Sequence, residues 1–348
     1  MAKQNRYLIV GGGLAGFSIA LHLEERSIDF RIVDPGINHS SIIAAGMINP
    51  LVFRRMNLSW RAKESIDYLR LFYRGVESKT SLSFFQNIDL RRIFSSQQER
   101  DNWLDRSSKP EFLQFMHPIN DSDDAYNQAP TPFGTGRLKN AFAVNTEVFI
   151  SGIREHFMNQ DKLTLLSFDH SDLTGMEYQG KSYDGVIFCE GYQLPSNPWF
   201  GELPLGQTKG EVLKVRTEAL PESEPLNRKC FVLPIGNHTF KVGSTYGWHT
   251  PDIEPSEEGK KQILEKLSYI CTGDVEVVDH TAGVRPTSPD RRPMIGPHWE
   301  HKDYYVFNGL GTKGYMIAPL LAKEFVEFLL DVKDLPEEVR VERFYPGR

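Results

Sequence analysis

The sequence predicts a mixed α/β protein, α+β overall, in which a parallel α/β unit is interleaved with an antiparallel sheet. Two observations predict the parallel unit. The chain opens with a strand, a glycine-rich turn, a helix and a second strand, and it closes with another strand, glycine-rich turn and apolar helix. A third observation predicts the antiparallel sheet, because short strand-like runs with polar breaks lie between these ends. In 348 residues this order predicts two domains between which the chain crosses more than once.

The opening unit has the pattern of a dinucleotide-binding turn. The apolar residues 7–10 form the expected first strand and lead into Gly11-Gly-Gly-Leu-Ala-Gly16, a G-x-G-x-x-G motif. Its glycines allow a tight turn and a close backbone approach to phosphate at the start of a helix expected over residues 17–25. A second strand over residues 28–33 ends at Asp34, whose carboxylate can bind ribose hydroxyls. These elements in this order predict a Rossmann-like domain.

The middle of the chain supplies the remaining elements. An amphipathic helix is expected over residues 60–76, and the polar stretch that follows, to about residue 138, is interpreted as irregular apart from a short helix over residues 97–104. Thr146 is a candidate N-cap of a helix that runs to residue 158. Further strands are expected over residues 163–168, 183–189, 211–215, 230–233, 239–242, 275–279 and 304–308, and further helices over residues 256–270 and 312–330.

The composition limits the possible functions. The net charge is −6 and no basic block stands out, which argues against non-specific nucleic-acid binding. Cys189, Cys230 and Cys271 are far apart, so neither a disulfide framework nor a metal site is expected. The apolar run near the start is interrupted by glycines and followed by the charged residues 24–26, unlike a signal peptide, and no run has the length of a membrane span. We therefore expect a cytoplasmic protein without a transmembrane segment, and peripheral contact with a membrane stays open.

Four blocks of the sequence carry a family resemblance. They are residues 7–34, residues 40–47, the strand that leads to Gly191, and the pair 282–296 and 308–319. In these blocks the chain resembles the D-amino-acid-oxidase-type family of FAD-dependent oxidoreductases, which includes glycine oxidase, sarcosine oxidase and D-amino-acid dehydrogenase. The last block is also similar to the oxidase half of the bifunctional enzyme that builds 5-methylaminomethyl-2-thiouridine in tRNA.

The resemblance implies a division into domains and a cofactor. Residues 1–75, 139–205 and 281–348 would form a Rossmann-like FAD-binding domain, and residues 76–138 and 206–280 an antiparallel-sheet substrate-binding domain. FAD would be bound non-covalently, because residues 287–289 hold no cysteine where related enzymes attach the flavin. The implied cofactor-binding residues are Gly11, Gly13, Leu14, Ala15, Gly16, Asp34, Ser40, Ser41, Ala45, Gly46, Met47, Phe168, Gly191, Arg285, Gly309, Gly311, Thr312, Lys313, Gly314 and Tyr315.

Three residues are candidates for the catalytic chemistry. Arg285 offers a planar guanidinium to a carboxylate or a flavin carbonyl; the alternative is that it only pairs with Asp279 or Asp290. Lys313, on the C-terminal glycine turn, can add positive charge beside the reduced flavin; the alternative is a solvated lysine at a helix start. Tyr246 either forms a wall of the substrate pocket or packs elsewhere.

The expected reaction is oxidation of a C–N bond in a small amino acid or secondary amine by hydride transfer to flavin N5, with O₂ or a quinone as electron acceptor. The alternatives are a flavin-dependent 2-hydroxy-acid or glycerol-phosphate-type dehydrogenase, an oxidase of a carboxymethylamino-modified tRNA base, an NAD-dependent dehydrogenase and a non-catalytic FAD-binding protein. No nucleic-acid partner is expected, since the sequence has neither a methyltransferase half nor a basic tract. All of this depends on the turns around Gly13 and Gly311 meeting at one flavin.

Overall fold

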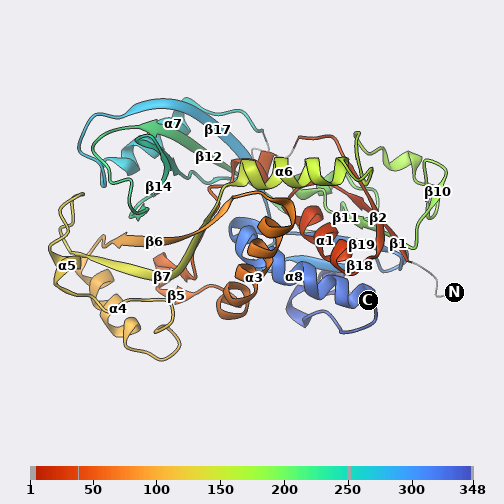
Figure 1. Ribbon diagram of the computed structural model, residues 1–348, viewed down its shortest axis with the longest axis horizontal. Helices are drawn as coiled ribbons and strands as arrows, with labels where there is room; N and C mark the ends of the chain where they lie inside the picture. Colours follow the sequence, from red (N-terminus) through yellow and green to blue (C-terminus); the bar gives the residue numbers. More distant parts are fainter. Residues whose placement is uncertain (1–4, 38, 249–251, 346–348) are drawn as a thin grey trace.

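The computed structural model describes residues 5–37, 39–248 and 252–345 and contains two large sheets that lie side by side (Figure 1). The six-stranded sheet, with its helices, occupies the right of Figure 1, and most of the nine-stranded sheet lies to the left. Two small hairpins complete the strands, β4 (Leu51–Val52) with β5 (Asn57–Leu58) and β9 (Glu177–Tyr178) with β10 (Lys181–Ser182).

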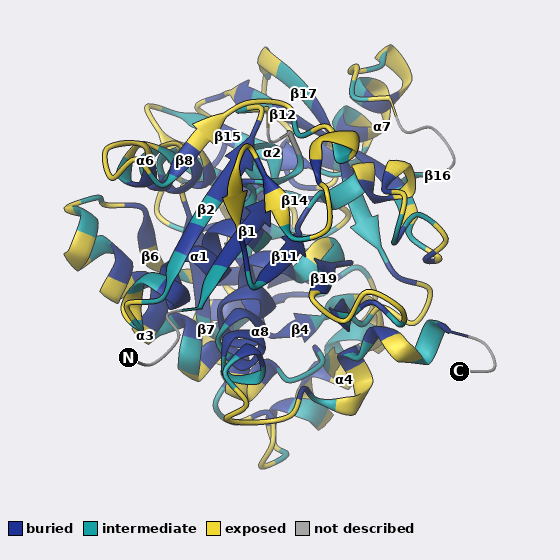
Figure 2. Ribbon diagram, turned by 90° about the vertical axis from the view of Figure 1, so that its right-hand side faces the viewer, coloured by how far each residue is buried: buried dark blue, intermediate teal, exposed yellow. Residues whose placement is uncertain are grey.

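The six-stranded sheet has the order β18-β19-β11-β1-β2-β8 and is parallel except at its β18 edge. Its strands are β1 (Arg6–Val10), β2 (Asp29–Asp34), β8 (Leu163–Leu165), β11 (Gly185–Phe188), β18 (Met294–Pro297) and β19 (Tyr304–Asn308). Successive side chains of β1 enter different cores, Ile9 the core beneath the helices and Leu8 the core on the opposite face. Figure 2 shows the central strands β1 and β11 largely buried. A sheet buried on both faces explains the continuous apolar runs of these strands.

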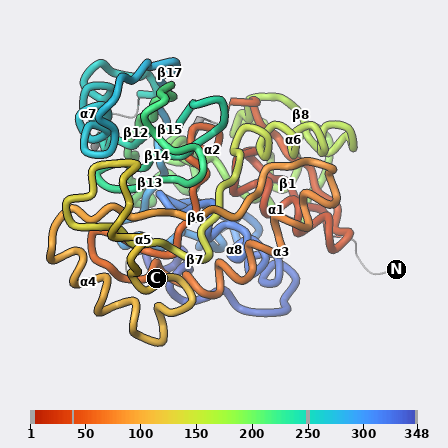
Figure 3. Tube along the Cα trace, turned by 60° about the vertical axis from the view of Figure 1, so that its left-hand side comes forward, coloured from red at the N-terminus to blue at the C-terminus, as the bar shows by residue number. Residues whose placement is uncertain are grey.

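Helices from distant parts of the chain cover one face of this sheet. They are α1 (Leu14–Glu25), α3 (Ala62–Thr80), α6 (Thr146–Met158) and α8 (Gly314–Leu329), and their buried residues share one core. Helix α1, near the start of the chain, packs beside α8, near its end (Figure 3). The short helix α2 (His39–Ile43) lies against the second sheet at β17.

The nine-stranded sheet has the order β16-β12-β15-β14-β13-β6-β7-β3, and β17 also pairs with β12. Its strands are β3 (Met47–Ile48), β6 (Phe85–Ile93), β7 (Thr135–Val144), β12 (Gly206–Arg216), β13 (Leu226–Asn227), β14 (Phe231–Gly236), β15 (Thr239–Gly243), β16 (Gly247–Trp248) and β17 (Glu276–Thr287). Helix α7 (Glu257–Leu267) packs on one end, while α4 (Gln97–Ser107) and α5 (Asp121–Asp124) accompany β6 and β7.

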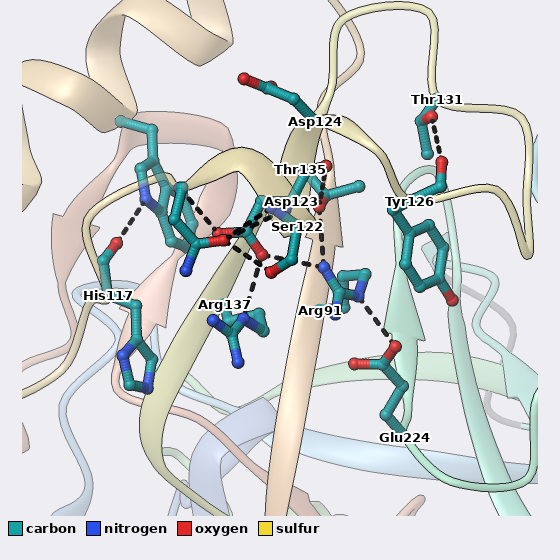
Figure 4. Close-up of polar contacts among 12 residues, drawn as sticks. Arg91, His117, Ser122, Asp123, Asp124, Tyr126, Thr131, Thr135, Arg137 and Glu224 are labelled. Carbon is teal, nitrogen blue, oxygen red and sulfur yellow. Dashed lines mark hydrogen bonds and ion pairs between the residues drawn. The ribbon is translucent and has the colours of Figure 1, made fainter.

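Strand β6 and the start of β7 correct the prediction that residues 76–138 are largely irregular. The arginines of these strands, Arg91, Arg92 and Arg137, are paired rather than solvated, and Figure 4 shows two of them around the fully buried Asp123. Asp123 Oδ1 accepts hydrogen bonds of 3.0 Å from both Arg91 and Arg137, and Arg91 also donates to Glu224 at 2.8 Å. These strands can bury arginines because partners from distant segments neutralise the charges. Their sequence is therefore polar and resembles that of a loop.

Three further expectations need correction. Asn145 is the N-cap of α6, since its side chain accepts from the Val148 N–H, whereas Thr146 Oγ1 donates to the Ile42 carbonyl at 2.6 Å. The strand expected over residues 275–279 runs on to Thr287. The last helix is preceded by a 3₁₀ turn, Gly311–Lys313. Strands β7 and β17 each cross a boundary of the proposed domains, and the assignment of those domains to cofactor and substrate stays a prediction.

Candidate functional site

A cavity of about 890 Å³ lies between the two sheets and is lined by both ends of the chain. Its wall includes Gly11 and Gly13 at the carboxyl end of β1 as well as Gly311 in front of α8. Open α/β sheets bind their ligands at the carboxyl ends of the strands. The structure thus brings the two glycine turns to one cavity, and that this cavity holds a flavin stays a prediction.

All of the predicted site residues line this cavity except Gly16 and Gly309. A Cβ on Gly16 would lie 1.9 Å from the Gly11 carbonyl oxygen, so this glycine lets α1 pack against the turn. Gly309 has a φ of +76°, and its N–H donates to Asn308 Oδ1 at 2.7 Å. Asn308 Nδ2 in turn donates to the Gly191 carbonyl at 2.9 Å, which joins the ends of β19 and β11. Both glycines therefore shape the site from behind its wall.

The carboxylate of Asp34 is held by the backbone at the edge of the cavity. Its Oδ2 accepts from the Gly12 N–H and its Oδ1 from the Gly36 N–H, each at 2.7 Å. The residue is only 2% exposed, and the nearest guanidinium nitrogen of Arg154 is 3.9 Å from Oδ1. These contacts fix the carboxylate in one orientation toward the cavity.

Residues 40–47 form a second wall that is tied to distant elements. Ser40 Oγ donates to the Val284 carbonyl of β17, and Tyr315 of α8 donates to the Ser41 carbonyl at 2.7 Å. Ser41 Oγ accepts from the Leu14 N–H at 3.0 Å, at the start of α1. The segment is therefore positioned by the opening helix, the last helix and the second sheet together.

Lys313 lies in the wall and is not a solvated lysine. Its Nζ donates to the Asn49 carbonyl at 2.9 Å, to Asn49 Oδ1 at 3.1 Å and to the Leu51 carbonyl at 3.2 Å. Burial lowers the pKa of Lys313 to about 8 because none of these oxygens carries a charge. The three contacts use the three N–H donors of the ammonium and connect the C-terminal glycine turn to residues 49–51.

Arg285 projects from β17 and is enclosed by the second sheet. Its Nη2 donates to Ser244 Oγ at 2.7 Å, and its guanidinium carbon lies 4.8 Å from the ring centre of Tyr246. Asp279 instead pairs with Lys214 and Asp290 with Arg343, and among the described residues no carboxylate forms an ion pair with Arg285. Burial lowers the pKa of Arg285 from its usual value. The guanidinium is therefore available to an anion in the cavity.

The space around the Arg285 guanidinium depends on a glycine of the neighbouring strand. A Cβ on Gly210 of β12 would lie 2.1 Å from Arg285 Nη2. Tyr246, whose ring lies against the guanidinium, lines the cavity and is itself 57% exposed.

Several cavity residues escaped the sequence analysis, among them Asn49, His170, Glu190 and Asn227. His170 Nε2 lies 2.8 Å from Glu190 Oε1. None of the four belongs to a spaced motif, and only the position of Glu190 directly before Gly191 offered a local signal. Within the described ranges, no group of three or more His, Cys, Asp or Glu side chains could hold a metal ion. No helix in the described part of the chain is long and apolar enough to cross a bilayer.

Comparisons with known proteins agree with this architecture. Glycine oxidase of Pseudomonas putida is 25% identical over 373 aligned residues, which cover 94% of this chain and 95% of that protein. The tRNA 5-methylaminomethyl-2-thiouridine biosynthesis bifunctional protein of Marinobacter nauticus is 23% identical, and the alignment covers 93% of this chain but 54% of that protein. The crystal structure of glycine oxidase from Geobacillus kaustophilus superposes with a TM-score of 0.78 at 19% identity, covering 95% of this chain and 96% of that one.

The family match covers nearly the whole chain. A family model described as FAD dependent oxidoreductase, DAO, matches residues 6–328. The matched region contains both glycine turns and every residue that lines the cavity. The chain belongs to the DAO family of FAD-dependent oxidoreductases.

Proposed function

We propose that the cavity binds FAD non-covalently and that the protein oxidises a C–N bond of an amino acid or a secondary amine. The observation that carries the proposal is that one cavity joins both glycine turns, Asp34 and the guanidinium of Arg285, which forms no ion pair with a carboxylate among the described residues. When bound, FAD would accept a hydride at N5 and so supply the oxidising half of the reaction.

The residues present fit a dinucleotide that lies along this cavity. Gly13 caps α1 without a side-chain hydrogen bond, and the Leu14 N–H donates to Ser41 Oγ, so the next backbone N–H groups at the start of this helix suit a phosphate. Asp34 is oriented to accept hydrogen bonds from ribose hydroxyls. Gly191 lines the cavity with a φ of +57°, and an added Cβ would meet no atom within 4 Å, so the backbone leaves open space there for the cofactor.

The chain's own contribution to catalysis is positioning. Arg285 would bind a substrate carboxylate through its planar fork, with Tyr246 and Ser244 holding the guanidinium in place. Lys313 would keep residues 49–51 against the C-terminal glycine turn and place positive potential beside the start of α8. The apolar side chains of Val212 and Phe231 line the same cavity and would exclude water from it.

The division of labour between the sheets is part of the proposal. Residues 1–75, 139–205 and 281–348 would hold the cofactor, and Arg285 of the last segment would reach the substrate carboxylate as well. Residues 76–138 and 206–280 would form the substrate-binding domain, to whose cavity wall residues 206–280 contribute directly. The electron acceptor would be O₂ or a quinone, and hydrogen peroxide release would distinguish them.

A substrate panel tests the proposed reaction. The purified yellow protein is mixed under anaerobic conditions with amino acids, secondary amines, 2-hydroxy acids and glycerol phosphate, and loss of flavin absorbance is followed. We expect loss with at least one amine and with none of the hydroxylated compounds. Bleaching by a hydroxy acid alone would overturn the assignment to C–N oxidation, and bleaching by none would support a non-catalytic FAD protein. Acid precipitation should leave the flavin in the supernatant if it is non-covalent.

A further inference from the structure

We propose that Asn227 binds a hydrogen-bond acceptor on the part of the substrate remote from Arg285, and that Arg92 and Glu99 hold its amide in the orientation this requires. The inference rests on the proposed function. It narrows the substrate class to amino acids or secondary amines that carry a second polar group beyond the carboxylate.

Asn227 presents a donor to the cavity. It is the last residue of β13 and lines the cavity, and its Oδ1 accepts a hydrogen bond from Nη1 of Arg92. Because an arginine only donates, this contact decides which end of the amide is oxygen and which is nitrogen. Asn227 Nδ2 has no hydrogen-bond partner among the described residues, and protein atoms do not enclose it completely. The nitrogen is therefore free to donate a hydrogen bond to a ligand.

Arg92 lies behind the cavity wall, where contacts with Glu99 and Phe53 hold it in place. It is 6% exposed, and its Nε and Nη2 lie 2.7 and 2.6 Å from Glu99 Oε1. Its guanidinium carbon also lies 4.9 Å from the ring centre of Phe53. The second carboxylate oxygen of Glu99 accepts from the Ser95 N–H at 2.7 Å, at the start of α4. Arg92 is thus a positioning residue that acts through Asn227.

The sheet register indicates how far this donor lies from Arg285. Asn227 pairs with Phe231 of β14, Phe231 with Gly243 of β15, and Gly243 with Val212 of β12. At about 4.8 Å per strand, β13 lies roughly 14 Å from β12. The Arg285 guanidinium lies over Gly210 of β12, so the two groups stand at opposite ends of a wall that contains Val212 and Phe231.

The positions of Arg285 and Asn227 on this wall determine which substrates can contact both residues. A carboxylate at Arg285 and an acceptor at Asn227 would be joined by a spacer of several atoms against apolar side chains. Glycine has its carboxylate but nothing that could reach Asn227. Substrates with a carbonyl, carboxylate or hydroxyl on the far side of the reacting nitrogen or on the side chain fit both groups.

Ligand binding to the FAD-loaded protein tests the inference without turnover. Pimelate, with two carboxylates, and heptanoate, with one on a chain of the same length, are titrated while the flavin spectrum is followed. In the unaltered protein pimelate should bind at least tenfold more tightly than heptanoate. Asn227→Asp keeps an oxygen for Arg92 but replaces the donor by a second acceptor. It should weaken pimelate binding by about 10–100-fold, the range for a hydrogen bond to a charged group, and heptanoate binding by less than threefold.

Asn140→Asp is the matched control, because Asn140 of β7 also accepts from an arginine, Arg70, but does not line the cavity. It should leave both dissociation constants unchanged. Arg92→Met should weaken the binding of pimelate but not that of heptanoate, and Arg92→Lys should restore part of the loss. Equal effects of Asn227→Asp on both ligands, or no effect on either, would overturn the inference. If the FAD-loaded protein binds these ligands as expected but no amine bleaches its flavin, the proposed reaction is contradicted while the role of Asn227 in binding is supported.

Discussion

At the scale of single residues, Lys313 shows how tertiary contacts change the chemistry that its position in the sequence suggests. A lysine at the start of a helix is unfavourable next to the positive end of the helix dipole. Here the side chain turns away from solvent and donates to the oxygens of Asn49 and Leu51. Its enclosure by uncharged acceptors explains why the protonated form is disfavoured.

Lys313 should make stability depend on pH in a known direction. The pKa of the folded state, about 8, lies below the ordinary value of 10.5, so between these values the unfolded chain binds the extra proton. The contribution of this group therefore becomes more favourable as pH rises from about 8 toward 10.5. Urea titrations of flavin-free protein at pH 7.5, 9 and 10 should show the wild-type free energy of unfolding rising relative to that of Lys313→Met. A constant difference would contradict the burial of the charge.

Arg285 should be required for substrates with a carboxylate. Arg285→Lys keeps the charge but loses the planar fork, and we expect kcat/KM to fall about 10–100-fold for such substrates. An amine without a carboxylate should be affected far less. Arg216→Lys is the control, since Arg216 lies on β12 in an exposed pair with Glu276. Equal losses for both substrate types would argue that Arg285 has only a structural role.

At the scale of elements, residues 40–47 pack so closely against the second sheet that a larger side chain at Gly46 does not fit. Gly46 has a φ of +74°, and an added Cβ would lie 1.9 Å from the Val144 carbonyl oxygen of β7. The small residues of this segment therefore reflect close contact with the second sheet as much as contact with a ligand.

Gly46→Ala should be far more destabilising than a change of a glycine that also has a positive φ but lies in open space. Gly175 has a φ of +60° and no atom within 4 Å of an added Cβ. Gly175→Ala should cost about 1–2 kcal/mol, the penalty of the left-handed conformation alone. Gly46→Ala should cost at least about 2 kcal/mol more, because backbone must move. Thermal unfolding of both variants measures the difference, and similar losses would show that the contact relaxes freely.

At the scale of the whole molecule, the cavity exists only when the two ends of the chain are folded together. Helices α1 and α8 share one core, and their N-terminal turns line one cavity. A ligand bound there contacts segments about 300 residues apart in sequence. Its binding energy should therefore stabilise the molecule as a unit.

FAD should raise the midpoint of thermal unfolding, and NAD should not. At a free concentration of 100 times the dissociation constant, a ligand of the native state adds about 2.7 kcal/mol of stability. Calorimetry of flavin-free protein with each dinucleotide measures this, and one transition should move as a whole. A shift with NAD but not with FAD would contradict the proposed cofactor.

The sequence by itself determined the parts of the protein whose patterns are local. The opening strand, glycine turn, helix and acidic strand end were readable because each is specified by neighbours in the chain, and β19 has the bounds that its apolar run predicts. Gly11 and Gly13 of this motif line the cavity.

Only the tertiary structure decided what depends on distant partners. The polar sequence of β6 did not indicate a strand, because nothing in it shows that Arg91 and Arg92 are paired. Their partners, Asp123, Glu224 and Glu99, come from other parts of the chain. Contacts between distant strands also decide whether Arg285 forms an ion pair with a carboxylate of the protein or faces the cavity without one. Such contacts orient the Asn227 amide as well. Periodicity records which residues are apolar, whereas a charged side chain is buried or solvated according to the partner that folding brings to it.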